Sequence, residues 1–174
     1  MSSLMLESPS YEVTDLLDFG PRAQERQPPP AVQRKRFVTF YQGDHLYGLA
    51  SDEVAEVVHP LPVSPLPNGP RFVQGISPLR GDIVAVINLK QLLGAAGTRA
   101  PERPKFVILK SIENEMRVAF RVDAMHELIT LTDGDLRTDE QLGSLLFANA
   151  TVDGRYIRMI HPPTLRTALD TSNE

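Results

Sequence analysis

Short apolar runs separated by turn residues dominate the chain from residue 36 onwards. Runs of this length, bounded by glycine and proline, favour β-strands over helices. The clearest pair, residues 73–78 and 83–87, is joined at the turn Arg80-Gly81-Asp82. Near the end of the chain, Asp153-Gly154 is typical of a type I′ hairpin turn. The pattern therefore predicts a mainly β protein built from short strands.

Two short helices are predicted from their end signals. Asn88 precedes the apolar run 89–93 and Gly94 follows it, which is the arrangement of an N-cap and a C-terminal glycine. Pro162-Pro163 begins a second helix over residues 164–169, because proline is accepted in a first turn. The proline-rich stretch 60–70 lacks the N–H groups of a central strand and is predicted to be a surface loop.

The second half of this β-region repeats the first. Aligning Gly81 with Gly154 places residues 83–87 on 156–160, and two further segments match in the same order at nearly the same spacing. These are residues 52–57 with 123–128, and 37–40 with 106–109. We therefore predict two similar β-subdomains, 36–94 and 105–161, each a small barrel.

The two ends of the chain have a different character. Residues 1–35 include Pro28-Pro29-Pro30 and a polar run, which are typical of a flexible N-terminal arm. Within the arm, apolar residues at positions 13, 16, 17 and 19 come close to helical spacing. This segment is either a short docking helix or a disordered stretch with chance periodicity. Residues 170–174 are predicted to form a C-terminal tail.

Composition excludes several classes of protein. Of the 174 residues, 41% are apolar, which is enough for a core, and none is cysteine. The N-terminus lacks the basic start of a signal peptide, and no apolar run approaches the roughly 18 residues of a membrane span. These features predict a soluble cytoplasmic protein without direct membrane insertion. The net charge of −4 argues against a nucleic-acid partner.

No motif for catalysis or for a cofactor stands out. The four histidines (His45, His59, His126 and His161) do not follow metal-ligand spacing. Residues 133–144 resemble a calcium loop, but Thr138 replaces its glycine and Ser144 its closing glutamate. We therefore predict no catalytic residue, no metal and no cofactor.

Two charged residues are candidates for an interaction surface. Arg80 lies in a turn, so its guanidinium must project outward, and arginine is favoured at interfaces because it forms paired bonds with carboxylates. Glu56 lies between Ala55 and Val57 in an apolar strand, with its side chain on the opposite face. The alternative interpretation is that both are ordinary solvated charges.

At these residues the chain resembles the CheW-like coupling domain of bacterial chemotaxis. The resemblance covers residues 36–169, more loosely in the second half. It is carried by Phe37-Val-Thr-Phe40, Tyr47-Gly-Leu49, Val54-Ala-Glu-Val57, Pro65-Leu-Pro67, Phe72-Val-Gln-Gly-Ile76, Leu79-Arg-Gly81, Ile83-Val-Ala-Val86 and Asn88-Leu89.

The resemblance implies two SH3-like five-stranded barrels around a shared core, with no enzymatic activity. It also implies two partners, the regulatory domain of a CheA-type histidine kinase and the cytoplasmic tip of a chemoreceptor. The residues that match the family's kinase surface are Val54, Glu56 and Arg80. The receptor tip is expected in the groove between the barrels, where no residues are assigned.

The chain also departs from the family pattern. Asn88 stands where the family usually has aspartate, and Ser77-Pro78 replaces an asparagine and an aliphatic residue. An alternative function is a small-molecule sensor that uses the cleft between the barrels. A ligand pocket needs a few convergent polar groups, and the sequence shows no such cluster.

Overall fold

The computed structural model describes residues 29–95, 97, 101–111 and 116–171. Most of the predicted arm, including the possible helix at 13–19, lies outside the described residues. Residues 29–33 are exposed and have no regular secondary structure. The first strand begins at Arg34, two residues before the predicted start of the β-region at residue 36, because Arg34 and Lys35 pair with Thr132 and Leu131. The flexibility of the arm stays a prediction.

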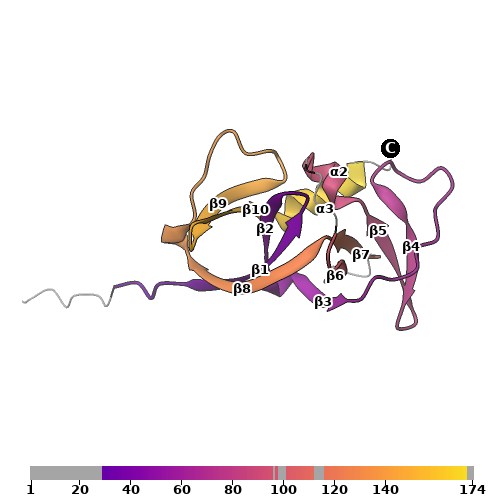
Figure 1. Ribbon diagram of the computed structural model, residues 1–174, viewed down its shortest axis with the longest axis horizontal. Helices are drawn as coiled ribbons and strands as arrows, with labels where there is room; N and C mark the ends of the chain where they lie inside the picture. Colours follow the sequence, from indigo (N-terminus) through magenta and orange to yellow (C-terminus); the bar gives the residue numbers. More distant parts are fainter. Residues whose placement is uncertain (1–28, 96, 98–100, 112–115, 172–174) are drawn as a thin grey trace, which may run out of the picture. The chain divides into compact units, whose positions relative to one another are not determined.

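The residues from Arg34 onwards form two five-stranded sheets (Figure 1). Sheet A has the order β8 (Ala124–Thr132), β1 (Arg34–Gln42), β2 (His45–Ala50), β10 (Arg155–Ile160) and β9 (Leu146–Val152). Sheet B has the order β3 (Val54–Val58), β6 (Lys105–Leu109), β7 (Arg117–Val122), β5 (Asp82–Ile87) and β4 (Val73–Leu79). The predicted all-β class with two five-stranded subdomains is confirmed.

Strands that match in the internal repeat occupy the same place in the two sheets. β5 and β10 are both fourth in the strand order, β1 and β6 are both second, and β3 and β8 both lie at an edge. The repeat seen in the sequence is therefore a repeat of strand position.

The prediction that each half of the sequence forms its own barrel is wrong. β1 and β2 come from the 36–94 half but join β8, β9 and β10 in sheet A, while β6 and β7 join the strands of the first half in sheet B. Four pairings join strands of different halves: β1 with β8 and β3 with β6 are antiparallel, whereas β2 with β10 and β5 with β7 are parallel. Parallel neighbours need a long crossover connection, so the local hairpin signals contain no information about these pairings.

One hydrophobic core extends across both sheets. Phe40 of sheet A and Phe120 of sheet B are fully buried, and their ring centroids lie 5.6 Å apart. Leu165 of the last helix is buried in the same cluster. A second cluster lies within sheet A and a third within sheet B. Each sheet therefore has an apolar cluster of its own, and the largest cluster is shared between the two sheets.

The helical elements follow their end signals. Asn88 Oδ1 accepts a hydrogen bond from the Gln91 N–H at 3.1 Å, and Gly94 ends α2 (Leu89–Leu93) in the left-handed conformation. α3 (Pro162–Thr171) continues beyond the predicted start of the C-terminal tail at residue 170. Two 3₁₀ turns, η3 (Ser51–Glu53) and η4 (Asp133–Asp135), complete the fold.

An ion pair ties α3 to the strands. Arg166 Nη2 lies 3.1 Å from Glu53 Oε2 and donates to the Lys110 carbonyl at 2.9 Å. Glu53 belongs to η3, which follows a strand of sheet A, and Lys110 follows a strand of sheet B. The arginine therefore connects the last helix to both sheets.

Candidate protein interaction site

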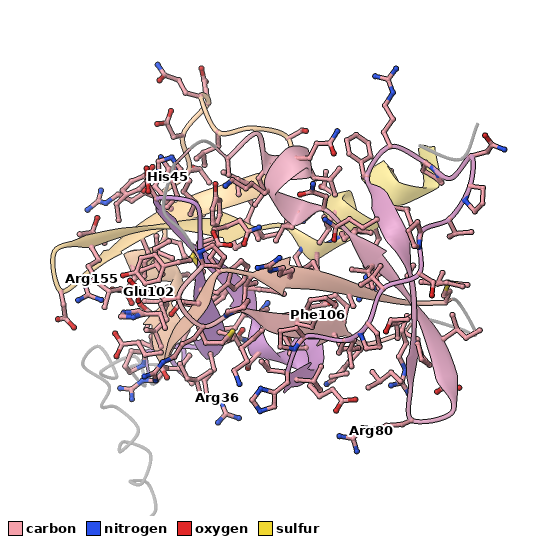
Figure 2. All side chains as sticks on the ribbon, turned by 45° about the vertical axis from the view of Figure 1, so that its right-hand side comes forward. Arg36, His45, Arg80, Glu102, Phe106 and Arg155 are labelled. Atoms are coloured by element: carbon pink, nitrogen blue, oxygen red, sulfur yellow. The ribbon has the colours of Figure 1, made fainter. Side chains whose placement is uncertain are left out.

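Barrel closure brings two of the three predicted site residues together. Arg80 Nη2 lies 2.9 Å from Glu56 Oε2, although the two residues belong to opposite edges of sheet B, the β4–β5 turn and β3. The Arg80 side chain is 73% exposed and that of Glu56 is 23% exposed. Arg80 lies at the end of the β4–β5 hairpin, on the outside of the molecule (Figure 2). The guanidinium is therefore paired and still open to a partner.

The backbone at Arg80 has a conformation that is rare for arginine. Its φ is 51°, in the left-handed region, and Gly81 follows with φ of 86°. Two consecutive positive φ values are typical of a type I′ turn, for which Asn-Gly and Asp-Gly are the favoured pairs. The turn Asp153-Gly154 meets this preference, with φ of 50° and 77°. Arg80 therefore holds a solvent-exposed turn position that glycine, asparagine or aspartate usually occupies.

Glu56 lies on an edge strand with alternating exposure. Ala55 and Val57 are exposed, while Glu56 is half-buried, so it is on the opposite face from its apolar neighbours, as predicted. Val54 is also half-buried and packs against the shared core. Of the three predicted residues, Val54 therefore supports the strand from inside, whereas Glu56 and Arg80 form the outer pair.

Exposed apolar side chains also occur on sheet B and directly before its strand β7. The exposed fractions are 39% for Val57, 54% for Ile83 and 57% for Met116. Ile83 and Met116 line a pocket of about 250 Å³ together with Asp82 and Arg117, whose side chains are 3.5 Å apart. Ile83 belongs to the strand predicted from its apolar run at residues 83–87. An apolar residue at a strand end produces the same pattern whether it is covered or exposed, so no signal in the sequence identifies this patch.

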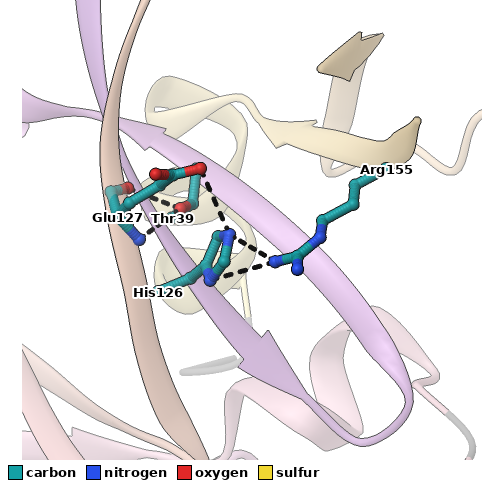
Figure 3. A network of polar contacts seen from close by, with 4 residues as sticks. All are labelled: Thr39, His126, Glu127 and Arg155. Atoms are coloured by element: carbon teal, nitrogen blue, oxygen red, sulfur yellow. Dashed lines mark hydrogen bonds and ion pairs between the residues drawn. The ribbon is translucent and has the colours of Figure 1, made fainter. Parts of the chain in front are cut away.

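A separate polar network joins strands of sheet A (Figure 3). Arg155 Nη1 lies 2.8 Å from His126 Nε2, and His126 Nε2 lies 3.3 Å from Glu127 Oε1. Thr39 contacts the Glu127 backbone through its hydroxyl group. These residues come from three strands, β1, β8 and β10, and hold the hairpin of β10 against β8.

The described residues contain neither a metal-binding cluster nor a membrane-spanning helix. Within residues 29–95, 97, 101–111 and 116–171, no three His, Asp or Glu side chains gather closely enough to hold a metal ion. In the same part of the chain, no helix has the length and apolar character that crossing a bilayer requires.

The chain is similar to a known family and to several known proteins. The family model described as CheW-like domain matches residues 36–169, which is most of the chain. The chain belongs to the CheW-like domain family. The chemotaxis protein CheW of Treponema pallidum is 30% identical over 129 residues, covering 71% of this chain and 75% of the relative. CheW of Thermotoga maritima is 27% identical and covers 73% of this chain and 84% of the relative.

Two further similarities support the function of this CheW-like protein. The protein FrzA of Myxococcus xanthus is 30% identical over 78 residues, covering 45% of this chain and 49% of the relative. The crystal structure of the scaffolding protein CheW from Thermoanaerobacter tengcongensis aligns with a TM-score of 0.66 at 26% identity, covering 78% of this chain and 88% of that structure. The CheW-like protein is a scaffold of chemotaxis signalling.

Proposed function

We propose that this CheW-like protein couples chemoreceptors to a CheA-type histidine kinase in the cytoplasm and catalyses no reaction itself. The observation that supports this most directly is the Arg80–Glu56 pair, which is outward-facing and held at 2.9 Å on sheet B. Arg80 and Glu56 are two of the three residues, with Val54, that match the family's kinase surface. The similar proteins support an adaptor and give no support to a small-molecule sensor.

The pair and its apolar neighbours have the composition of a docking surface. A guanidinium has five donors, so Arg80 can keep its bond to Glu56 and still bind a partner carboxylate. Ile83, which follows the β4–β5 turn, adds exposed apolar area on the same sheet. An apolar centre with arginine at its side is the usual arrangement of a binding hot spot. The kinase regulatory domain is the partner proposed for this surface.

The first test removes the Arg80 guanidinium and keeps the backbone conformation of the turn. Arg80→Gly keeps the turn, because glycine adopts a φ of 51° readily, and removes the side chain. We expect the variant to fold with an unchanged melting temperature and to bind the kinase regulatory domain at least about tenfold more weakly by isothermal calorimetry. Arg80→Glu should bind more weakly still, because it adds repulsion from Glu56 and from any carboxylate of the partner.

Arg137→Glu is the matched control. Arg137 is exposed and belongs to the sheet A side of the fold, so the same change of charge occurs away from the proposed surface. Its affinity for the kinase domain should equal that of the unmodified protein. Equal affinity for folded Arg80→Gly, Arg80→Glu and the unmodified protein would remove Arg80 from the kinase contact. Binding of a receptor-tip peptide should be unchanged in all three variants, because we expect the tip in the groove between the barrels.

A further inference from the structure

A bulge in β8 brings two neighbouring side chains into contact. The register between β1 and β8 shifts between Val38 and Phe40, so His126 and Glu127 both lie opposite Thr39. Adjacent residues of a regular strand point to opposite faces of the sheet, but a bulge redirects a side chain. Here His126 Nε2 lies 3.3 Å from Glu127 Oε1 (Figure 3). The bulge therefore places a histidine beside a carboxylate within one strand.

A cation from another strand approaches the same nitrogen atom. Arg155, the first residue of β10, has its Nη1 atom 2.8 Å from His126 Nε2 and 3.4 Å from Nδ1. Because β10 is not a neighbour of β8 in the strand order of sheet A, this contact is not part of a hydrogen-bonded ladder. The imidazole ring thus lies between a positive and a negative group that come from different strands.

The two contacts of Nε2 require different protonation states of the ring. A guanidinium only donates hydrogen bonds, so Nε2 accepts from Arg155 only when it carries no proton. An ionised carboxylate only accepts, so Nε2 bonds to Glu127 only when it carries one. A single nitrogen atom cannot do both at once. The neutral ring with its proton on Nδ1 suits Arg155, whereas the doubly protonated ring suits Glu127 and is repelled by Arg155.

We propose that His126 is a proton-operated switch that holds or releases Arg155. The neutral ring accepts from Arg155 and so holds the β9–β10 hairpin against β8. As the pH falls through the range in which histidine ordinarily gains a proton, about pH 5–8, the ring bonds to Glu127 and repels the guanidinium. The His126 side chain is 21% exposed, so a proton reaches it from solvent. The stability from the Arg155 contact is present while the ring is neutral and is lost when the ring takes up a proton.

Other charged and titratable groups lie around this pair. The Tyr41 ring of β1 meets the His126 ring edge-on, with centroids 5.6 Å apart. Arg103, in the segment before β6, forms a bridge to Ala124, and Glu102 precedes it. A pocket of about 450 Å³ is lined by Tyr41, Asp44, His45, Leu46, Arg155, Tyr156 and Arg158. Among these groups, the histidines are those that ordinarily change charge between about pH 5 and 8.

Release of Arg155 changes the charge that this pocket presents. Arg158 already lies over the Tyr156 ring, with its Cζ atom 5.1 Å from the ring centroid. A released Arg155 guanidinium adds a second cation that no longer bonds to the imidazole. The switch therefore makes one face of sheet A more cationic at low pH, and it is independent of the Arg80 surface on sheet B.

The experiment follows both side chains by NMR in the full ¹³C,¹⁵N-labelled chain between about pH 8 and pH 5. We expect the Arg155 Cζ and His126 Cε1 resonances to move with one common midpoint. His126→Gln retains a hydrogen-bonding side chain that takes up no proton in this range, so its Arg155 resonance should stay in place. His45→Gln removes the other histidine near Arg155 and is the matched control. Its Arg155 resonance should respond as in the unmodified protein.

Amide hydrogen exchange gives a second readout at the β9–β10 hairpin, where Arg155 pairs with Val152. Protection factors, which correct for the pH dependence of exchange itself, should fall about threefold at low pH, as expected for loss of one partly exposed contact. Arg155→Met should show the lower protection at both pH values, whereas Arg158→Met, on the same strand, should keep the pH dependence.

Three results would overturn the proposal. The first is an Arg155 resonance that does not move with that of His126. The second is an Arg155 resonance that moves equally in His126→Gln and in the unmodified protein, because the proton would then bind elsewhere. The third is equal protection of the hairpin amides at high and low pH in the unmodified protein.

Discussion

Thr39 occupies the point where the ladder between β1 and β8 is interrupted. The register shifts between Val38 and Phe40, so the Glu127 backbone has no regular strand partner there. The Thr39 hydroxyl donates to the Glu127 carbonyl at 2.5 Å and accepts from the Glu127 N–H at 3.1 Å. One side chain thus satisfies two backbone groups in an interior position, since Thr39 is fully buried.

We predict that Thr39→Val destabilises the protein although it keeps the shape of the side chain. The change leaves the Glu127 N–H and carbonyl without their partner, which costs about 1–3 kcal/mol. Urea denaturation should show a lower free energy of unfolding with an unchanged m-value. Thr39→Ser keeps the hydroxyl and should recover most of the loss. A valine variant as stable as the unmodified protein would show that the hydroxyl contributes nothing at this bulge.

Asp135 contributes a pH-dependent stability at η4. Its Oδ2 accepts hydrogen bonds from the Thr132 backbone N–H and from the Thr132 hydroxyl, each at 2.8 Å. Both bonds hold the pKa of Asp135 below its ordinary value, and the bond from the Thr132 backbone N–H makes the larger contribution. Because the folded pKa is the lower one, the folded state binds fewer protons. The stabilisation is therefore present above the unfolded pKa of about 3.9 and is lost as the pH falls through the folded value.

The measurement compares the unmodified protein with Asp135→Asn at several pH values. We expect the variant to be slightly less stable near pH 7, and the difference to shrink as the pH falls below about 4. Asp153→Asn, in the exposed β9–β10 turn, is the control and should show no such trend, because asparagine suits that turn equally well. A difference between the unmodified protein and Asp135→Asn that is the same at every pH would rule out the carboxylate as its cause.

At the scale of elements, the predictable features are those whose causes lie close together in sequence. The cap at Asn88, the end of α2 at Gly94 and the Asp153-Gly154 turn all lie within a few residues of the groups they satisfy. Strand pairing is different. Leu46 pairs with Ile157, and no local signal selects that partner over any other apolar run.

The candidate sites also differ in whether their causes are local or distant in sequence. An outward-facing Arg80 could be predicted because its turn is local. The ion pair with Glu56 could not, since it depends on closure of sheet B from its two edges. A pocket of about 260 Å³ lined by Gln42 and Arg121 could not be predicted either, because its polar residues are scattered singly along the sequence.

At the scale of the whole molecule, the exchange of strands makes the two sheets one folding unit. Sheet A combines β1 and β2 with β8, β9 and β10, so it closes only after the rest of the chain has been made. The largest core cluster includes Phe40 from sheet A and Val107 from sheet B. Removal of either sheet would expose the apolar face of the other.

We therefore predict that the intact protein unfolds in a single transition and that neither half of the sequence folds alone. Fragment 36–94 contains β1 to β5, but β1 and β2 lack β8 and β10, and β3 and β5 lack β6 and β7. Fragment 105–161 contains β6 to β10, but β6 and β7 lack β3 and β5, and β8 and β10 lack β1 and β2. Calorimetry of the intact chain should give one peak, and each fragment should give the circular dichroism spectrum of an unfolded chain. Mixing the two fragments should restore strand signal, because together they supply every strand.

Fragment 54–122 is the control, since it is similar in length but contains all five strands of sheet B in one continuous stretch. We expect it to show strand signal, unlike fragment 36–94, and to melt well below the intact protein, because Val107 and Phe120 lose their cover from sheet A. If chain length alone decided folding, fragments 54–122 and 36–94 would show the same strand signal by circular dichroism. Two separate transitions in the intact chain, or a stably folded 36–94 fragment, would contradict a core shared between exchanged strands.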